Sequence, residues 1–516
     1  MISKLVHATP LPALQKFENF LLGDYRRLRL FLGTVPPEML EEISRKKAKH
    51  IFKLASKETP AYKNFLARKK INPKKIKSTK LFDEVVPETD KENYIKKYSF
   101  EKRCREGHLP KHGNVDESGG TSGKATNWIH DFHEESLLLK AVQFEFNYAF
   151  GGDKKDIFVL SAWSSGPWAT GVKFCELMER IALVKNTTTD SKDVINTLKM
   201  FGKKKNYLIG GYPPFVKNLI DDNEDHINWK DYNLDLVIGG EGVTLEWVYH
   251  VKSKLGPNSK IVSSYGASDI DIGVGFESPL CFEIREAINR DKDLQLALFG
   301  KEGVPMIFQY NPTMHYIQNK LNKEGKQEFH VTFLDWHAAL PKIKYNLHDE
   351  GKRFSYLNMM KALRKHKPKL YKHIKKSKRE QKNILHLPFL CIFGRSDGTL
   401  SFDGANVFPS QIEDIVIGDK ELSKNTSRFK LEKRHDHQHN TEFHVHIELK
   451  KGKKRSKELQ QKYVKTFLSE LLKVNPDFKE SYTKNKRLKP VVNLHVFDDA
   501  LFKVDDLKAK NIYFVK

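Results

Sequence analysis

Apolar residues recur along the chain in a pattern that predicts an α/β fold. Between residues 36 and 69 they repeat at helical spacing until Pro60 interrupts them, which predicts helix. From Asp156 onward, short apolar runs alternate with stretches of helical periodicity. The runs cover residues 157–160, 207–209, 234–238 and 260–262, and the helical stretches include residues 190–201 and 244–255. Strands that alternate with helices in this way form a parallel sheet with helical crossover connections.

The last third of the chain has a different pattern. Residues 354–382 have helical periodicity and many lysines, which predicts an exposed basic helical insertion. Beyond Gly394 the predicted elements are a helix at 410–416, strands at 428–432 and 443–449, a helix at 457–474 and a strand at 491–496. We therefore expect a large α/β domain over residues 1–393 and a small α+β domain over residues 394–516.

Composition excludes a membrane protein. Of the 516 residues, 39% are hydrophobic and 30% are charged, which is enough apolar material for buried cores and too much charge for a chain that lies in lipid. The longest apolar run, near residues 384–393, carries His386 and Pro388 and is too short to cross a bilayer. The first residues lack the apolar core of a signal peptide. We therefore expect no membrane span and a cytoplasmic location.

Cysteine and histidine usage favours structural roles over metal binding. The four cysteines lie far apart and outside any CxxC pair, which favours reduced thiols over disulfides or a thiolate zinc site: Cys104, Cys175, Cys281 and Cys391. Five histidines lie close together at positions 435, 437, 439, 444 and 446. The first three fall in a polar turn and the other two on one face of a strand, so ordinary strand alternation explains them better than a metal site does.

The net charge of +25 comes from 90 Lys and Arg residues against 65 Asp and Glu residues. Dense basic charge can mark a nucleic-acid partner. The lysines are nevertheless spread through almost every segment, which is typical of a solvated surface rather than a patch that follows phosphates. We expect no nucleic-acid partner.

One polar loop has the chemistry that nucleotide phosphates need. Glycines let backbone N–H groups approach an anion, hydroxyls donate to phosphate oxygens, and lysine supplies charge. All three occur in Ser118, Gly119, Gly120, Thr121, Ser122, Gly123 and Lys124. The loop is not a Walker A motif, because Ala125 stands where that motif has Ser or Thr, and a GxGxxG fingerprint is absent. Alone, such a loop is also typical of an ordinary flexible turn.

Further segments follow the loop in a fixed order: residues 264–269 (Ser-Tyr-Gly-Ala-Ser-Asp), 345–349 (Tyr-Asn-Leu-His-Asp), 394–398 (Gly-Arg-Ser-Asp-Gly) and 404–413. Together they resemble the adenylate-forming (acyl-CoA synthetase/ligase) superfamily, closest to the phenylacetate-CoA ligase branch. The resemblance spans most of the chain from about residue 45. It implies a large N-terminal α/β adenylation domain and a small mobile α+β C-terminal domain. It also implies that ATP converts a carboxylic acid to an acyl-adenylate with release of pyrophosphate, and that the acyl group then passes to a thiol.

The resemblance assigns roles to individual residues. Those implied to bind ATP or AMP are residues 118–124, Gly240, Glu241, Tyr265, Gly266, Ser268, Asp349 and Arg395, with Lys124 also implied to be catalytic. Within this set the loop would hold the β and γ phosphates, Tyr265 would stack on adenine, and Asp349 would bind the ribose hydroxyls. Asp269 stands where the family usually has a glutamate that binds Mg²⁺, and aspartate is also a suitable oxygen ligand. The family's Arg-Thr-Gly before the ribose carboxylate is Asn-Leu-His at residues 346–348.

Two further roles concern domain movement and the acid. Asp397 matches the hinge about which the C-terminal domain turns. Lys508 matches the lysine that reaches the substrate carboxylate and the α-phosphate, with Lys510 as the alternative, because Leu507 replaces the expected glycine. Three aromatic residues fall where the family builds its acyl pocket, although aromatic residues there are also common core fillers: Trp163, Trp168 and Tyr212.

Three functions remain open at this point. The first is a ligase that uses ATP, Mg²⁺ and coenzyme A to activate a small carboxylic acid. The second is an adenylating enzyme that loads an acyl carrier protein or an amine. The third is a non-catalytic relative that binds nucleotide, which the departures at Asp269, residues 346–348, Leu507 and Asn511 favour. The motifs do not identify the acid, and the oligomeric state stays open, with a homodimer among the alternatives.

Overall fold

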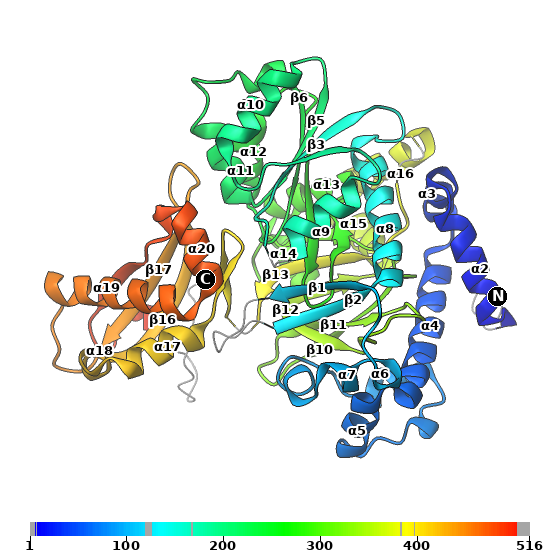
Figure 1. Cartoon of the computed structure of the whole chain (residues 1–516), viewed down its shortest axis with the longest axis horizontal. Coiled ribbons are helices and arrows are strands. Elements are labelled where there is room, and N and C mark those ends of the chain that lie inside the picture. The colour runs from blue at the N-terminus through cyan, green and yellow to red at the C-terminus, as the bar shows by residue number, and fades with distance from the viewer. Residues whose placement is uncertain are drawn as a thin grey trace.

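The computed structural model describes residue 6 and residues 8–118, 126–166, 169–381, 384–396 and 398–502. Within these residues an eleven-stranded mixed sheet forms the centre of the large domain, in the order β10-β11-β12-β13-β9-β8-β7-β6-β5-β3-β4. Figure 1 shows the small C-terminal domain beside this sheet and the N-terminal helices on the opposite side of the molecule. No helix in the described residues is long and apolar enough to cross a membrane.

The parallel half of the sheet confirms the strands and crossover helices expected from the apolar runs. Its strands are β3 (Ile157–Ala162), β4 (Leu183–Asn186), β5 (Asn206–Gly211), β6 (Asn233–Ile238) and β7 (Ile261–Ala267). The helices between them are α9 (Ala169–Met178), α10 (Ser191–Phe201), α11 (Pro213–Asp221) and α12 (Leu245–Lys254). All six residues of β3 are buried, as expected for a strand covered on both faces.

The other half of the sheet is antiparallel, which the apolar runs did not predict. It consists of β8 (Asp271–Phe276), β9 (Met306–Gln309), β10 (His315–Leu321), β11 (Gln327–Phe333), β12 (Tyr345–Phe354) and β13 (Phe389–Arg395). Helices α13 (Pro279–Asn289) and α14 (Lys292–Phe299) connect β8 to β9. The predicted domain boundary between residues 393 and 394 falls inside β13, and the chain leaves the sheet after Arg395.

The N-terminal part of the chain is helical and packs against the sheet. It comprises α2 (Leu11–Leu22), α3 (Tyr25–Thr34), α4 (Pro37–Glu58), α5 (Pro60–Arg68), α6 (Thr79–Val85) and α7 (Phe100–Arg103). The predicted helix over residues 36–69 is present and breaks at Thr59, which precedes Pro60. A residue before proline is disfavoured in helical conformation, which accounts for the break.

A two-stranded ribbon and a long helix lie next to the sheet. The ribbon pairs β1 (Gly113–Ser118) with β2 (Thr126–Asp131), and α8 (Phe132–Phe150) follows directly. Asp131 caps α8, because its side chain accepts a hydrogen bond from the backbone of Glu134 at 2.8 Å and the Glu134 side chain accepts one in return. The helix ends at Gly151, which has a left-handed conformation with φ of 76°.

The basic segment forms α15 (Tyr356–His366) and α16 (Pro368–Gln381). One face of these helices is solvated as expected, but the other is not. Met359, Leu363 and Ile374 are buried against α13 and β9 in an apolar cluster. The lysines therefore line the outer side of a structural element of the large domain.

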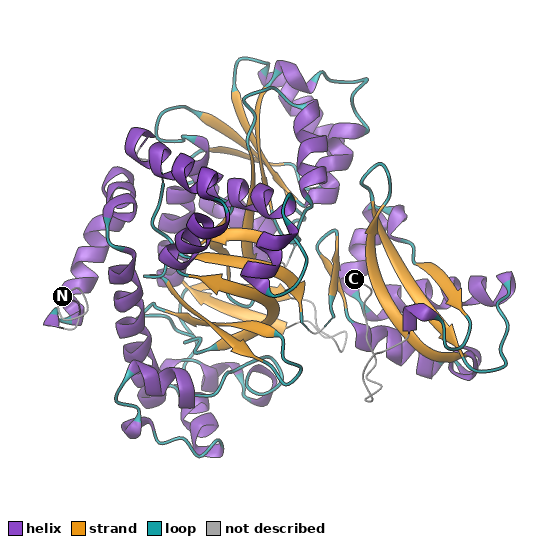
Figure 2. Ribbon diagram, turned by 180° about the vertical axis from the view of Figure 1, so that it is seen from behind, coloured by secondary structure: helices purple, strands orange, loops and turns teal. Residues whose placement is uncertain are grey.

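The small domain has its own core. Its sheet pairs β16 (Thr426–His435) antiparallel to β17 (Thr441–Leu449) and β17 parallel to β18 (Val491–His495). Its helices are α17 (Pro409–Gly418), α18 (Lys420–Asn425), α19 (Lys457–Val474) and α20 (Pro476–Lys484), and a short ribbon pairs β14 (Leu400–Phe402) with β15 (Ala405–Val407). Phe443, Phe467 and Leu471 are fully buried within it. Figure 2 shows this sheet separated from the large one.

Candidate active site

Three predicted nucleotide ligands lie together at strands β7, β12 and β13. The Tyr265 hydroxyl donates to Asp349 Oδ2 at 2.5 Å, and Arg395 Nη1 lies 3.7 Å from Asp349 Oδ1. The Tyr265 ring stacks on Phe308 with ring centroids 5.5 Å apart. Burial and the neighbouring Asp349 carboxylate raise the pKa of Tyr265 well above its ordinary value, so the phenol stays protonated and remains a donor. The arrangement offers an aromatic face, a carboxylate and a guanidinium to one ligand.

Glu328 holds the polar residues on either side of this group in position. It accepts hydrogen bonds from Asn346 Nδ2 at 2.7 Å and from the Ser396 hydroxyl. Burial alone would raise the pKa of Glu328, but hydrogen bonds from His348, Ser396 and Asn346 lower it well below its ordinary value. The carboxylate therefore fixes the segments that carry Asp349 and Arg395. The residues that depart from the family pattern at 346 and 348 thus have a structural function here.

Asp269 is buried beside the end of the β1–β2 ribbon. Its Oδ2 accepts a hydrogen bond from the Tyr345 hydroxyl at 2.9 Å, and Lys91 Nζ lies 3.3 Å from its Oδ1. Lys91 also donates to Ser118 Oγ at 3.2 Å, and the Trp128 indole N–H donates to the same oxygen at 2.8 Å. Ser118 is therefore connected through Lys91 to the predicted magnesium ligand. Sequence reasoning did not single out Lys91.

The residues around Asp269 do not form a resident metal site. They offer one carboxylate, and both of its oxygens already contact Tyr345 or Lys91. No group of three or more His, Cys, Asp or Glu residues in the described ranges could hold a metal ion. A role of Asp269 toward Mg²⁺ that arrives with ATP stays a prediction, and no chemical step is assigned to the ion below.

A buried lysine connects three elements behind this site. Lys173 on α9 is 1% exposed, and its Nζ lies 2.8 Å from Asp116 Oδ2, 2.9 Å from Glu135 Oε1 and 3.7 Å from Asp271 Oδ1. Burial alone would lower the pKa of Lys173, but the three carboxylates raise it above its ordinary value. The charged amine therefore holds the ribbon, α8 and β8 together. The sequence gives no signal for it, because exposed residues of α9 such as Val172 and Glu176 stand on either side of Lys173.

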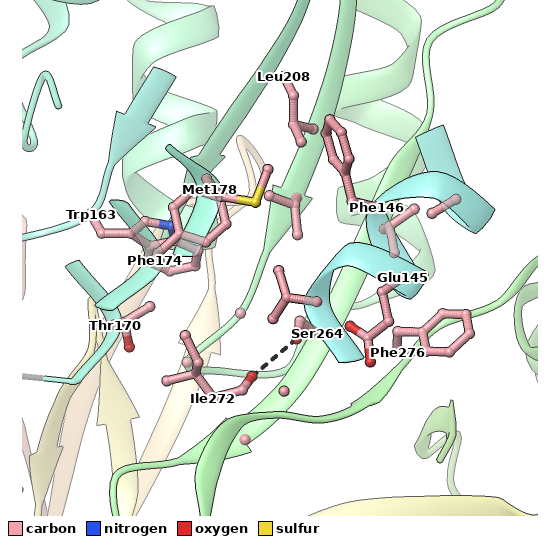
Figure 3. Close-up of a pocket in the computed structure, with 18 of the residues that line it drawn as sticks. Glu145, Phe146, Trp163, Thr170, Phe174, Met178, Leu208, Ser264, Ile272 and Phe276 are labelled. Carbon is pink, nitrogen blue, oxygen red and sulfur yellow. Dashed lines mark hydrogen bonds between the residues drawn. The ribbon is translucent and has the colours of Figure 1, made fainter. Parts of the chain in front are cut away.

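An apolar cavity of about 890 Å³, open side included, adjoins the predicted nucleotide ligands (Figure 3). Its walls are mostly apolar side chains from α8, α9 and the parallel strands: Phe146, Phe150, Trp163, Phe174, Met178, Leu208 and Phe276. Gly239, Gly240, Gly266 and Ser268 line its edge at the C-terminal ends of β6 and β7. Only glycine fits at position 266, because a Cβ atom there would lie 2.3 Å from the Asp271 carbonyl oxygen. Ligand sites in α/β sheets lie at this edge of the strands.

The aromatic residues predicted for the acyl pocket differ in position. Trp163 lines the cavity. Tyr212 is not among the lining residues within the described part of the chain, and it packs edge-on against Trp163 with ring centroids 4.8 Å apart. A Cβ atom on Gly240, whose φ is 84°, or on Gly404 of the small domain would collide with the Tyr212 ring. Tyr212 therefore fills the space between Trp163 and Gly240 of the large domain and Gly404 of the small domain.

Glu241 contacts the small domain. Its buried carboxylate accepts a hydrogen bond from Lys433 Nζ of β16. Burial raises the pKa of Glu241 to about 7, and Lys433 opposes this effect. Lys217 of α11 also reaches across and donates to Asn440 Oδ1 at 3.0 Å. The turn that carries Gly240 and Glu241, two predicted nucleotide ligands, therefore also contacts the small domain.

Several predicted site residues lie outside the described residues. They are Gly119, Gly120, Thr121, Ser122, Gly123, Lys124, Trp168, Asp397 and Lys508. Their roles stay predictions. Ser118, the described end of the predicted phosphate loop, pairs with Thr126 across the β1–β2 ribbon.

Comparison with known proteins identifies the fold. No family model matches the chain, and no curated protein matches its sequence. Solved structures of 2-hydroxyisobutyryl-CoA ligase are similar over nearly the whole chain. The complex with 2-HIB-AMP and CoA in the thioesterification state has a TM-score of 0.62 at 12% identity and covers 94% of this chain and 91% of that chain. An open conformation with the same ligands has a TM-score of 0.54 at 13% identity, with coverages of 92% and 91%. The postadenylation complex with 2-HIB-AMP has a TM-score of 0.52 at 13% identity, with coverages of 94% and 92%.

The chain therefore has the fold of the adenylate-forming CoA ligases. This confirms, at the level of fold, the superfamily resemblance of the motifs and the expected architecture of a large α/β domain and a small α+β domain.

Proposed function

We propose that the protein uses ATP to activate a carboxylic acid as an acyl-adenylate, releases pyrophosphate, and then transfers the acyl group to the thiol of coenzyme A. One observation carries the proposal. An apolar cavity and the Tyr265–Asp349 pair adjoin the same strand, β7, at the edge where Gly266 and Ser268 lie. An acid in the cavity could therefore bring its carboxylate to the α-phosphate of a nucleotide bound at Asp349.

The side chains suit the first chemical step. A carboxylate oxygen would attack the α-phosphorus, and pyrophosphate would leave with its bonding electrons. Tyr265 would stack on adenine, and Asp349 would accept hydrogen bonds from the ribose hydroxyls. Arg395 would donate hydrogen bonds to the ribose or to a phosphate group. Fixed donors and cations stabilise the charge that develops in such a transition state. We assign the β and γ phosphates to residues 118–124, and the lysine at the reacting carboxylate to Lys508, with Lys510 as the alternative.

The arrangement of the domains supports coenzyme A as the acceptor. The TM-score is 0.62 with the thioesterification state of 2-hydroxyisobutyryl-CoA ligase and 0.52 with its postadenylation state, at the same coverage of this chain. The contacts from Glu241 to Lys433 and from Lys217 to Asn440 would then belong to the thioester-forming pose. Asp397 would be the hinge between the two poses.

Acid-dependent exchange of pyrophosphate into ATP tests the first step. We expect exchange with some members of a broad panel of carboxylic acids, and we expect Lys124→Ala and Asp349→Asn to abolish or strongly reduce it. The control is Glu176→Gln, an exposed position on α9 that should leave exchange unchanged. If ATP binds but no acid supports exchange, the chain is a nucleotide-binding relative without this activity.

Detection of the acylated acceptor by mass spectrometry, a thioester or an amide, tests the second step. The active acid and ATP are incubated with coenzyme A, with an acyl carrier protein, or with an amine. We expect an acyl-CoA product. Product formed only with the carrier protein or only with the amine would replace coenzyme A as the acceptor while leaving the adenylation step in place.

A further inference from the structure

A carboxylic acid side chain projects into the apolar cavity. Glu145 lies on α8 between the buried residues Phe144 and Phe146. Figure 3 shows its carboxyl group directed into the cavity, on the side of Ser264 and Phe276. The rest of this wall is apolar, so the carboxyl group is the one acidic group among the described lining residues.

Glu145 has no polar partner among the residues that the structure describes. No described residue forms a hydrogen bond or ion pair with its carboxyl group. Burial is the cause that raises the pKa of Glu145, to about 8, and no neighbouring charge contributes. A carboxyl group that is half-buried among apolar side chains without a hydrogen-bond partner is unfavourable, and such groups are concentrated at functional sites. A bound ligand that hydrogen-bonds to the group would offset this cost.

The walls define the rest of the ligand. Phe146, Met178 and Leu208 lie together at one end of the cavity, Glu145 lies nearer to Ser264 and Phe276, and Gly240 and Ser268 line the edge next to the predicted nucleotide ligands. An acid held with its carboxylate at that edge would extend along these walls, and its body would pass Glu145. A methyl group there would leave the carboxyl group unpaired, whereas a hydroxyl or an ammonium group would satisfy it.

We propose that Glu145 determines specificity in this cavity, which selects carboxylic acids whose apolar body carries a hydrogen-bond donor, either a hydroxyl or an amine. The inference rests on the proposed function, because it takes the cavity as the acid site. The two donors share the ability to pair with Glu145. They differ in charge, since an amine would draw Glu145 into an ion pair and a hydroxyl would pair with its neutral form.

Matched acids test the proposal. The probes are hexanoate, 6-hydroxyhexanoate and 6-aminohexanoate, the corresponding eight-carbon acids, and benzoates with a 4-methyl, 4-hydroxymethyl or 4-aminomethyl group. Calorimetric titration of the full-length protein measures binding, and pyrophosphate exchange measures kcat/KM. We expect a donor-bearing acid to exceed its methyl counterpart by about 10- to 100-fold, the range of a hydrogen bond to a buried carboxyl group. Preference for the amine or the hydroxyl identifies the donor.

Variants at Glu145 connect the preference to this side chain. We expect Glu145→Leu to abolish or reverse the preference. We expect Glu145→Gln to keep the binding of hydroxyl-bearing acids and to weaken the binding of amine-bearing acids. Glu176→Gln serves as the control and should keep the wild-type preference. Removal of this unpaired, half-buried carboxyl group should not unfold the protein, and the melting temperature of each variant checks this.

Two results would overturn the inference. One is wild-type protein that binds the methyl acids as well as their donor-bearing counterparts. The other is a preference that Glu145→Leu leaves unchanged. Binding is measured without turnover, so a chain that fails to adenylate any acid would refute the proposed function while the binding preference still decides the inference.

Discussion

Replacement of Lys173 by methionine should destabilise the large domain strongly. Methionine keeps much of the volume and removes the charge that faces Asp116, Glu135 and Asp271. Each pair at 2.8 to 3.7 Å corresponds to an attraction of about 4 to 6 kcal/mol at an effective dielectric constant of about 20. The cost of burying the charges offsets most of this attraction. Loss of one partner from a buried pair typically costs about 3 to 5 kcal/mol, and we expect Lys173→Met to fall in this range.

The stability lost in Lys173→Met should depend on pH. Burial raises the pKa of Asp116 and of Glu135 above their ordinary values, and Lys173 opposes the rise. Without Lys173 these pKa values should rise further, so the folded variant holds protons that the unfolded chain has released. A carboxyl group with a raised pKa in the folded state costs stability as pH increases. The loss of stability that Lys173→Met causes relative to the wild type should therefore be larger at pH 8 than at pH 5.

Urea unfolding followed by tryptophan fluorescence measures the effect. A loss of about 3 kcal/mol lowers the midpoint by about 1 M for an m-value of about 3 kcal/mol/M. The control, Lys199→Met, removes an exposed lysine from α10 and should change the midpoint little. Adding Asp116→Asn to Lys173→Met should restore part of the stability, because one unpaired charge is removed. A Lys173→Met protein as stable as the control at both pH values would refute the reasoning.

Three further predictions concern the site and the domain contact. The pKa of Glu145 is raised from 4.5 to about 8, so wild-type stability should fall by about 3 kcal/mol between pH 5 and pH 8 from this group. Glu145→Gln should then raise the melting temperature more at pH 8 than at pH 5, and an equal gain at both would contradict this. Tyr265→Phe removes the 2.5 Å hydrogen bond to Asp349 and should raise KM for ATP about tenfold, whereas an unchanged KM would exclude the pair from nucleotide binding. Lys433→Ala leaves Glu241 unpaired between the domains and should slow thioester formation without slowing pyrophosphate exchange. Equal slowing of both reactions would mean that the contact does not belong to one pose.

The parallel half of the fold follows from sequence because burial and periodicity agree there. Strands β3 and β5 are buried on both faces, so each appears as a continuous apolar run between helical stretches. The antiparallel half gives no such signal. Strand β12 contains the polar residues Asn346, His348 and Asp349, and it is a strand because those groups pair with Glu328 and Arg395 on its neighbours. Pairing over long sequence separations fixes this part of the sheet.

The candidate site could be predicted only in part, for a related reason. Motifs identify Tyr265, Asp349 and Arg395, because several residue types occur together in a fixed order. Their mutual contacts depend on the register between β12 and β13, which sequence does not give. The motifs assign no role to Lys91 or to Glu145. A lysine among 90 basic residues, or a glutamate in a helix, gains meaning only from burial and from the groups that surround it.

Under the proposed function, strand β7 would serve both the acid and the nucleotide. Successive side chains of a strand point to opposite faces. Ser264 and Gly266 line the cavity, whereas Tyr265 between them hydrogen-bonds to Asp349. At position 266 the backbone of β8 approaches so closely that no side chain fits, so glycine is needed for β8 to pair with β7 at this point. An acid and a nucleotide bound on the two sides of this strand can meet only beyond its C-terminal end, near Ser268. A change in the packing of β7 on β8 should therefore alter binding of both ligands together, whereas changes at Glu145 and at Tyr265 should each affect one.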